Sequence, residues 1–292
     1  MKKKFKKVVI VGMGLIGGSI GKTLLKKGFA EEVVAVVRRE SAIDEVMQVC
    51  GATSVTLNGI EAVKGADVLI LAVPVGMIVP KAIELAPFLS KDCLVTDVGS
   101  TKGKIVEKLE KVFEEKALFV GSHPMAGTEK GGVFAAREDL FDKAVCILTP
   151  TPMTPPEAVT KAEAFWNMIG MEVIELEPVN HDKVLARISH LPHLAAYALV
   201  RAVAVDTNTN MNSNLVAGGF LGTTRIASSP PNLWVDIFFD NSKEVIASGK
   251  RFISEMENII KALEEKDDKE LLKLLEESKV YRDAIVKKLK KG

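Results

Sequence analysis

The sequence predicts an α/β protein in two parts, a domain with a mostly parallel sheet over residues 1–178 and an all-helical domain over residues 179–292. In the first part, short apolar runs alternate with stretches of helical spacing, which is typical of βαβ units. In the second part the β-like runs disappear, and apolar residues recur every 3.6 positions over 184–205, 233–263 and 269–289. A chain of 292 residues is long enough for two such domains.

The expected strands are seven short apolar runs, at 8–11, 33–37, 68–73, 94–97, 118–121, 145–149 and 173–176. They are continuous rather than alternating, as expected of strands that helices cover on both faces. Most of them end in Gly, Pro, Ser or Asp. Because ligands bind at the carboxyl ends of the strands in an open α/β sheet, we expect functional residues there.

Composition excludes several classes of protein. With 39 basic and 38 acidic residues the net charge is +1, so no nucleic-acid partner is expected. No apolar run approaches the ~20 residues of a membrane span, and the glycines after the basic start argue against a signal peptide. The three cysteines, Cys50, Cys93 and Cys146, are far apart and have no metal-ligand spacing. We therefore expect a cytoplasmic protein that lies outside membranes and holds no metal.

A glycine-rich turn follows the first expected strand directly and opens a helix; its residues are Gly12, Met13, Gly14, Leu15, Ile16 and Gly17. In this context the pattern is the fingerprint of a Rossmann-like dinucleotide-binding domain. Gly12 permits the tight turn, Gly14 lets the backbone approach a pyrophosphate, and Gly17 allows close helix–strand packing. Val73 and Pro74, at the end of another strand, are expected beside the same cofactor.

The end of the second expected strand indicates which cofactor binds. An NAD-specific domain carries an acidic residue about 20 positions after the glycine turn, to bond the ribose. Here that position is Val37, followed by Arg38 and Arg39, and guanidinium groups are suited to a 2′-phosphate. The sequence favours NADP, and Glu40 keeps NAD as the alternative.

Two polar runs follow neighbouring strands, 97–102 and 121–129, and both are expected to point into the nicotinamide cleft. His123, in the second run, is expected in a loop at the end of a strand. Its ordinary pKa of ~6.5 suits it to accept a proton near neutrality. His190 and His193 flank Pro192, which would disturb a helix, so they are expected to contact substrate or pack together rather than bind a metal. A later glycine-rich run ends at Arg225, whose guanidinium suits a carboxylate.

In this order, these elements resemble the prephenate/arogenate dehydrogenase family of tyrosine biosynthesis. The matching segments are 12–17, 97–102, the SHPMAG run at 122–127, the SHLPH run at 189–193, and 219–225 leading to Trp234. The resemblance spans nearly the whole chain. It implies a dinucleotide-binding domain, a helical domain that forms a homodimer, and an active site between the two.

The family pattern also implies a role for each site residue. His123 is the base at the ring C4 hydroxyl while hydride leaves C4, and carbon dioxide then leaves C1. Ser100 helps to hold the hydroxyl and the nicotinamide. The expected substrate contacts are His190, His193, Arg225, Thr128 and Glu129. The substrate is prephenate or arogenate, between which no residue discriminates.

Two other functions stay open. Another two-domain NADP-dependent hydroxyacid or imine reductase would share this architecture, but such enzymes commonly use a lysine on a helix, whereas His123 is the prominent candidate here. A non-catalytic NADP-binding protein would keep the fold without turnover. Retention of the base, the arginine and the glycines together argues against the second alternative.

Overall fold

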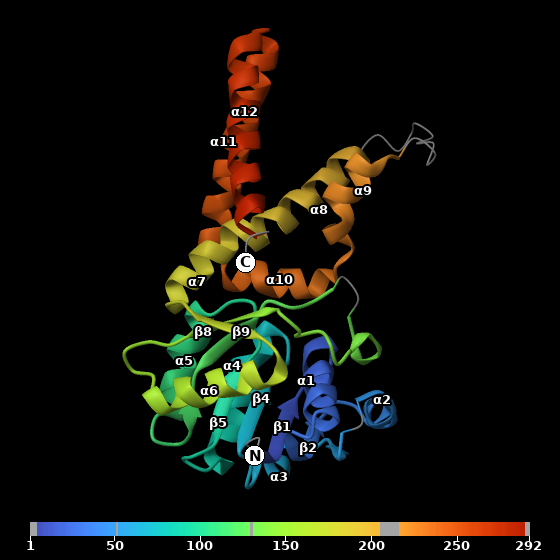
Figure 1. Cartoon of the computed structure of the whole chain (residues 1–292), viewed down its shortest axis with the longest axis vertical. Coiled ribbons are helices and arrows are strands. Elements are labelled where there is room, and N and C mark those ends of the chain that lie inside the picture. The colour runs from blue at the N-terminus through green and yellow to red at the C-terminus, as the bar shows by residue number, and fades with distance from the viewer. Residues whose placement is uncertain (1–4, 51, 129–130, 205–215, 290–292) are drawn as a thin grey trace. The chain divides into compact units, whose positions relative to one another are not determined.

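The computed structural model describes residues 5–50, 52–128, 131–204 and 216–289 (Figure 1). The chain divides into two compact units, residues 1–242 and 243–292. The first unit holds both sheets and the helices up to α10, and the second holds two long helices. The domain division at 178/179 stays a prediction.

The main sheet confirms the predicted α/β class. Six parallel strands lie in the order β3-β2-β1-β4-β5-β6, which is the order of a dinucleotide-binding doubly wound sheet. The strands are β1 (Phe5–Val11), β2 (Ala30–Val36), β3 (Ser54–Thr56), β4 (Val68–Leu71), β5 (Leu94–Asp97) and β6 (Leu118–Phe119). β3 was missing from the prediction, because its three residues have no apolar run.

Helices cover both faces of this sheet, so alternate residues of β1 belong to different cores. Val8 and Ile10 pack with α1, α2 and α6, whereas Val9 and Val11 pack with α3, α4 and α5. This explains why β1 is continuously apolar over residues 8–11. The helices are α1 (Leu15–Lys26), α2 (Ser41–Cys50), α3 (Gly59–Val63), α4 (Val75–Leu85), α5 (Gly103–Phe113) and α6 (Pro156–Ile169), with a short 3₁₀ helix, η1 (Ala86–Phe88), after α4.

A second, three-stranded sheet corrects one prediction. Its order is β7-β8-β9, formed by β7 (Gly121–Pro124), β8 (Val145–Thr149) and β9 (Glu172–Glu175), with β7 antiparallel to β8. His123 therefore lies in a strand, paired with Ile147, and not in a loop. The Ser-His-Pro sequence has low strand propensity, but Pro124 is tolerated because β7 is the edge strand of this sheet.

The segment that carries His190 and His193 is continuously helical. It runs through α7 (Pro178–Leu185), a π-helical turn, η3 (Ala186–His190), and α8 (Leu191–Ala204). Pro192 was predicted to disturb a helix, and the α-helical pattern is indeed interrupted just before it by the π-helical turn, although the segment stays helical through the proline. Further short elements are η2 (Val133–Ala135), α9 (Gly218–Thr224), η5 (Arg225–Ser228) and α10 (Pro231–Asp240).

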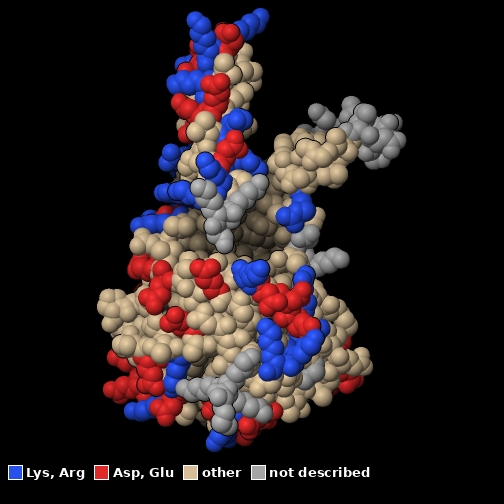
Figure 2. All heavy atoms as spheres, viewed as in Figure 1, with Lys and Arg blue, Asp and Glu red and all other residues tan. Residues whose placement is uncertain are grey.

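The second unit consists of α11 (Ser242–Glu264), most of which belongs to it, and α12 (Asp268–Leu289). Apolar side chains stand exposed along both helices, among them Phe252, Met256, Leu272 and Tyr281. Figure 2 shows Lys/Arg and Asp/Glu side chains interspersed over these helices, as expected from the near-neutral net charge. In the part of the chain that the structure describes, no helix is long and apolar enough to cross a bilayer.

The glycine turn offers a matched pair of substitutions. A Cβ on Gly17 would lie 2.0 Å from the Gly12 carbonyl oxygen, whereas a Cβ on Gly14 would meet no atom within 4 Å. We expect Gly17→Ala to lower the free energy of unfolding by about 1–3 kcal/mol through overpacking. Gly14→Ala should change it by less than about 0.5 kcal/mol.

Urea denaturation of both variants measures the difference. Equal stability of the two variants would contradict the close packing of α1 on β1 at Gly17.

Candidate functional site

Two adjoining cavities lie at the carboxyl ends of the strands of the main sheet. The first, of ≈630 Å³, is lined by the glycine turn at Gly12, Met13 and Gly14 and by Arg38 and Arg39. The second has a volume of ≈600 Å³. Five residues line both cavities: Gly14 of the glycine turn, Ala72, Val73 and Pro74 after β4, and Gly132 before η2.

The first cavity fits an extended dinucleotide. Gly12 has a φ of 96°, a left-handed conformation that favours glycine, and a Cβ there would lie 2.4 Å from the Ala72 carbonyl oxygen. Gly14 is the N-cap of α1 and has open space where a Cβ would be, so backbone N–H groups of the helix start can approach a phosphate.

The second cavity brings together residues that are far apart in the sequence. Besides the shared Gly14, Val73 and Pro74, the predicted site residues that line it are Leu15, Ile16, Ser100, His123, Thr128, His190, His193 and Arg225. Among the predicted residues that the structure describes, Gly17 alone lines neither cavity; it packs under the turn. Glu129 lies outside the described residues.

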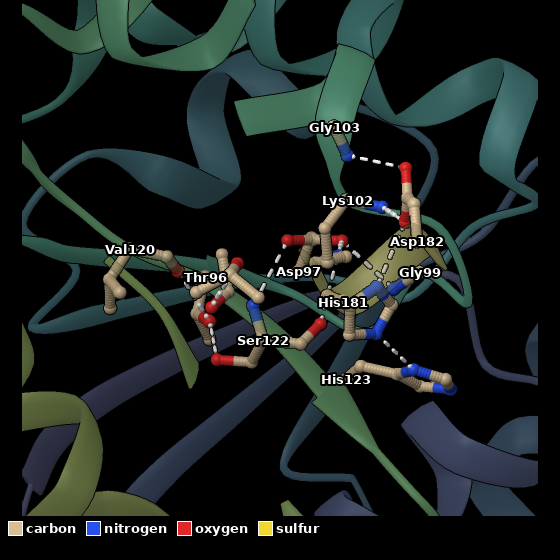
Figure 3. Close-up of polar contacts among 12 residues, drawn as sticks. Thr96, Asp97, Gly99, Lys102, Gly103, Val120, Ser122, His123, His181 and Asp182 are labelled. Atoms are coloured by element: carbon tan, nitrogen blue, oxygen red, sulfur yellow. Dashed lines mark hydrogen bonds and ion pairs between the residues drawn. The ribbon is translucent and has the colours of Figure 1, made fainter. Parts of the chain in front are cut away.

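His123 is the cavity end of a chain of hydrogen bonds (Figure 3). Its Nδ1 lies 2.8 Å from Nε2 of His181, whose Nδ1 lies 2.9 Å from Oδ1 of Asp182. Burial, the His181 ring and the Lys102 charge lower the pKa of His123 well below 6.5. The imidazole is therefore neutral at physiological pH and has a lone pair with which to accept a proton.

Beside His123, a buried ion pair joins the two sheets. Lys102 and Asp97 are both fully buried, and the Lys102 ammonium donates to the Asp97 carboxylate and, at 2.9 Å, to the Ser122 carbonyl oxygen. The Ser122 N–H donates to Asp97 at 3.3 Å. The prediction that the whole 97–102 run points into the cleft is thus wrong for Asp97, Thr101 and Lys102, because these charges and the hydroxyl are turned inward.

A second set of hydrogen bonds fixes the Ser122 side chain, one residue before His123. Trp166 Nε1 donates to the Ser122 hydroxyl at 3.0 Å, and the same hydroxyl bonds Thr96. Thr96 in turn donates to the Val120 carbonyl oxygen at 2.9 Å. The backbone and the side chain of Ser122, in β7, are therefore both hydrogen-bonded to the end of β5.

Two further histidines, His190 and His193, line the second cavity beside Trp234. The His193 ring stacks on Trp234, with centroids 3.5 Å apart, and Asn241 Nδ2 lies 3.3 Å from His190 Nδ1. Burial lowers the pKa of both His190 and His193 to about 4, so both rings are neutral. The indole N–H of Trp234 is buried without a hydrogen-bond partner among the described residues.

Sequence reasoning missed His181 and Asp182 as parts of the site. They lie at the start of the helical segment, 58 and 59 positions after His123 in the sequence. The adjacent His-Asp pair soon after Pro178 was the only local signal. This pair becomes part of the site only through the contact of His181 with His123 in β7, and no periodicity in the sequence predicts that contact.

Comparisons with known proteins agree with this geometry. The family model "Prephenate dehydrogenase, nucleotide-binding domain" matches residues 20–175, and "Prephenate dehydrogenase, dimerization domain" matches residues 177–277. Prephenate dehydrogenase of Bacillus subtilis is 34% identical over 95% of this chain and 76% of its own length. Cyclohexadienyl dehydrogenase of Zymomonas mobilis is 33% identical over 96% of each chain.

A solved structure is similar over the same extent. The crystal structure of prephenate dehydrogenase from A. aeolicus, in complex with hydroxyphenyl propionate and NAD+, is 33% identical and has a TM-score of 0.86. The similarity covers 98% of this chain and 100% of that one, so both cavities fall within it.

The buried ion pair yields a stability prediction. Lys102→Met leaves the Asp97 carboxylate buried without its cation, and we expect a loss of about 3–5 kcal/mol in the free energy of unfolding. Adding Asp97→Asn removes the remaining charge and should restore part of that loss. The exposed Lys64 pairs with Glu61 on the surface, so the control variant Lys64→Met should cost less than about 1 kcal/mol.

Urea unfolding of these three variants and of the unaltered chain measures the differences. A Lys102→Met variant as stable as Lys64→Met would show that the buried pair does not hold the two sheets together.

Proposed function

The chain belongs to the prephenate dehydrogenase family, and on that premise we propose that it catalyses the oxidative decarboxylation of prephenate or arogenate in tyrosine biosynthesis. The products are 4-hydroxyphenylpyruvate from prephenate or tyrosine from arogenate. One observation carries the proposal: the neutral imidazole of His123, Ser100 and Arg225 line one cavity together with the glycine turn. A base, a polar clamp and a cation thus surround the place where substrate and nicotinamide meet.

A nicotinamide cofactor, held at the glycine turn, would supply the hydride acceptor for ring carbon C4. His123 accepts the hydroxyl proton at Nε2 as the C4–H bond breaks, because its Nδ1 is already engaged by His181. Loss of carbon dioxide from C1 then leaves an electron pair that aromatises the ring and restores negative charge on the C4 oxygen. His123 returns the proton to that oxygen, so the residue ends each cycle neutral.

Arg225 and His193 are proposed to bind the substrate. Both line the second cavity, and the guanidinium is suited to a carboxylate. The His193 ring is held flat on Trp234, so it presents a fixed polar edge. Ser100 and Thr128 line the same cavity and are proposed to bond the ring hydroxyl and a substrate oxygen.

NADP is the proposed cofactor, with NAD as the alternative. Arg38 and Arg39 line the first cavity, whereas Glu40 is not among the described residues that line it. This supports a 2′-phosphate at the end of β2. The A. aeolicus enzyme was solved with NAD+, so the choice needs a direct test.

The chain is further proposed to act as a cytoplasmic homodimer. One of its two matching family models is described as a dimerization domain, and α11 and α12 carry many exposed apolar side chains. The three cysteines are free and buried, which supports a reducing compartment.

Initial rates of nicotinamide reduction test the function directly. Purified chain is assayed with prephenate or arogenate and with NAD or NADP, in all four combinations. Turnover in any combination is the expected result. Folded protein that binds NADP and turns over neither substrate would contradict the proposal and favour a non-catalytic dinucleotide-binding protein.

The pKa of His123 sets the expected pH dependence. Because the pKa of this base lies below 6.5, the neutral form persists as pH falls from about 8 to 6.5. We expect kcat/KM to stay level over that range and to fall only at lower pH, where His123 becomes protonated. His123→Asn should lose on the order of 10²–10⁴ in kcat and lose the acid limb, while NADP binding is kept.

An acid limb centred above pH 6.5 would contradict the assignment of a buried neutral base. So would a His123→Asn variant with normal kcat.

The cofactor proposal makes a separate prediction. Replacing Arg38 and Arg39 with Ala should raise the KM for NADP by about 10-fold or more, through loss of charge-assisted bonds. The KM for NAD, which has no 2′-phosphate, should change little and serves as the internal control. Equal changes for both cofactors, or none, would remove the basis for NADP.

A further inference from the structure

We propose that His181 and Asp182 are positioning residues that hold the His123 ring in one tautomer, with its proton on Nδ1, so that Nε2 is always the atom that exchanges the proton with the substrate. This inference rests on the proposed function, because it assigns the direction of proton transfer in that reaction. It is based on the order of donors and acceptors in the hydrogen bonds that join Asp182, His181 and His123 (Figure 3).

The hydrogen-bond chain begins at the carboxylate of Asp182, which acts only as an acceptor. The N–H groups of Lys102 and Gly103, at the start of α5, donate to Oδ1 and Oδ2 of Asp182, each at 2.8 Å. Burial alone would raise the pKa of Asp182, but these bonds and the one from His181 lower it overall. Asp182 is therefore ionised and can only accept, so the atom facing it, Nδ1 of His181, must carry a hydrogen.

The position of the ring hydrogen on His181 in turn determines its position on His123. Burial lowers the pKa of His181 although Asp182 opposes the shift, so the ring is neutral and carries a single ring hydrogen. With that hydrogen on Nδ1, Nε2 of His181 is an acceptor. It lies 2.8 Å from Nδ1 of His123, which must then donate. The lone pair of a neutral His123 is left on Nε2.

The same arrangement suits the protonated intermediate of the reaction. When His123 takes up the substrate proton, Nδ1 still donates to His181, so no hydrogen bond reverses. Burial, the His181 ring, Lys102 and His190 all oppose the imidazolium, so His123 holds the proton only briefly before it is released. The base accepts the proton and also releases it, as the proposed reaction requires.

Substitutions at His181 separate positioning from packing. His181→Phe keeps a ring but removes the acceptor for His123, and we expect kcat to fall roughly 10–100-fold, as for groups that orient a functional histidine. The KM should stay within roughly threefold, because substrate contacts are kept. His181→Gln retains an amide oxygen for His123 and an amide N–H₂ for Asp182, so it should recover a large part of the lost kcat.

The matched control destabilises the same helix, α7, without altering the hydrogen bonds that join Asp182, His181 and His123. Glu177 caps α7 by accepting from the N–H groups of Val179 and Asn180, at 3.2 and 2.9 Å. Glu177→Ala should lower the urea midpoint of unfolding and leave kcat unchanged. If His181→Phe and Glu177→Ala reduce kcat alike, or if the Gln variant is no better than the Phe variant, His181 is only a packing residue.

A measurement that needs no turnover tests the tautomer itself. Protonated and unprotonated ring nitrogens have distinct ¹⁵N chemical shifts, and the chain has four histidines, so His123 can be assigned by comparison with His123→Asn. We expect His123 to carry its hydrogen on Nδ1 in the unaltered chain, and His181→Phe to shift population to the Nε2–H form. A hydrogen on Nε2 in the unaltered chain, or one tautomer in both proteins, would overturn the proposal.

The turnover assay and the ¹⁵N shifts distinguish a failure of the proposed function from a failure of the positioning role of His181. Absence of turnover with every substrate and cofactor would reject the proposed function, and the ¹⁵N shifts would still decide the role of His181. Normal turnover with an unchanged His181→Phe variant would reject the positioning role alone.

Discussion

The ion pair between Lys102 and Asp97 is the interaction on which the site depends. Two fully buried charges at the end of β5 are costly to desolvate unless their remaining bonds are satisfied, and here they are satisfied by β7. The ammonium binds the Ser122 carbonyl oxygen and the carboxylate binds the Ser122 N–H. The strand that carries His123 is thereby fixed against the main sheet, in a single register.

The same charges shape the chemistry. Burial and, to a smaller extent, the Lys102 charge lower the pKa of both His123 and His181, so the proton-accepting form is the resting form. Asp182 accepts from the backbone N–H groups of Lys102 and Gly103, at the start of α5. One turn of chain therefore supplies a cation that adds to the effect of burial on the base and the N–H groups that anchor the carboxylate orienting it.

The sequence predicts the parts of this site that depend on local chemistry. The turn from Gly12 to Gly17 and the apolar strands carry their own signals, because close approach and two-sided burial restrict residue type locally. β7 was predicted as a loop, because Ser-His-Pro forms a strand only when β8 lies beside it. The contact of His181 with His123 joins residues 58 positions apart, which local patterns do not encode.

The central claim is that substrate and cofactor meet at the residues shared by the two cavities, with the ring hydroxyl on His123. A crystal structure of the chain with NADP and 4-hydroxyphenylpyruvate tests it most directly. The account predicts the nicotinamide beside Gly14 and Pro74, and the phenolic oxygen within hydrogen-bonding distance of His123 Nε2 and Ser100. A phenolic oxygen bound away from His123, or a nicotinamide outside the shared wall, would contradict it.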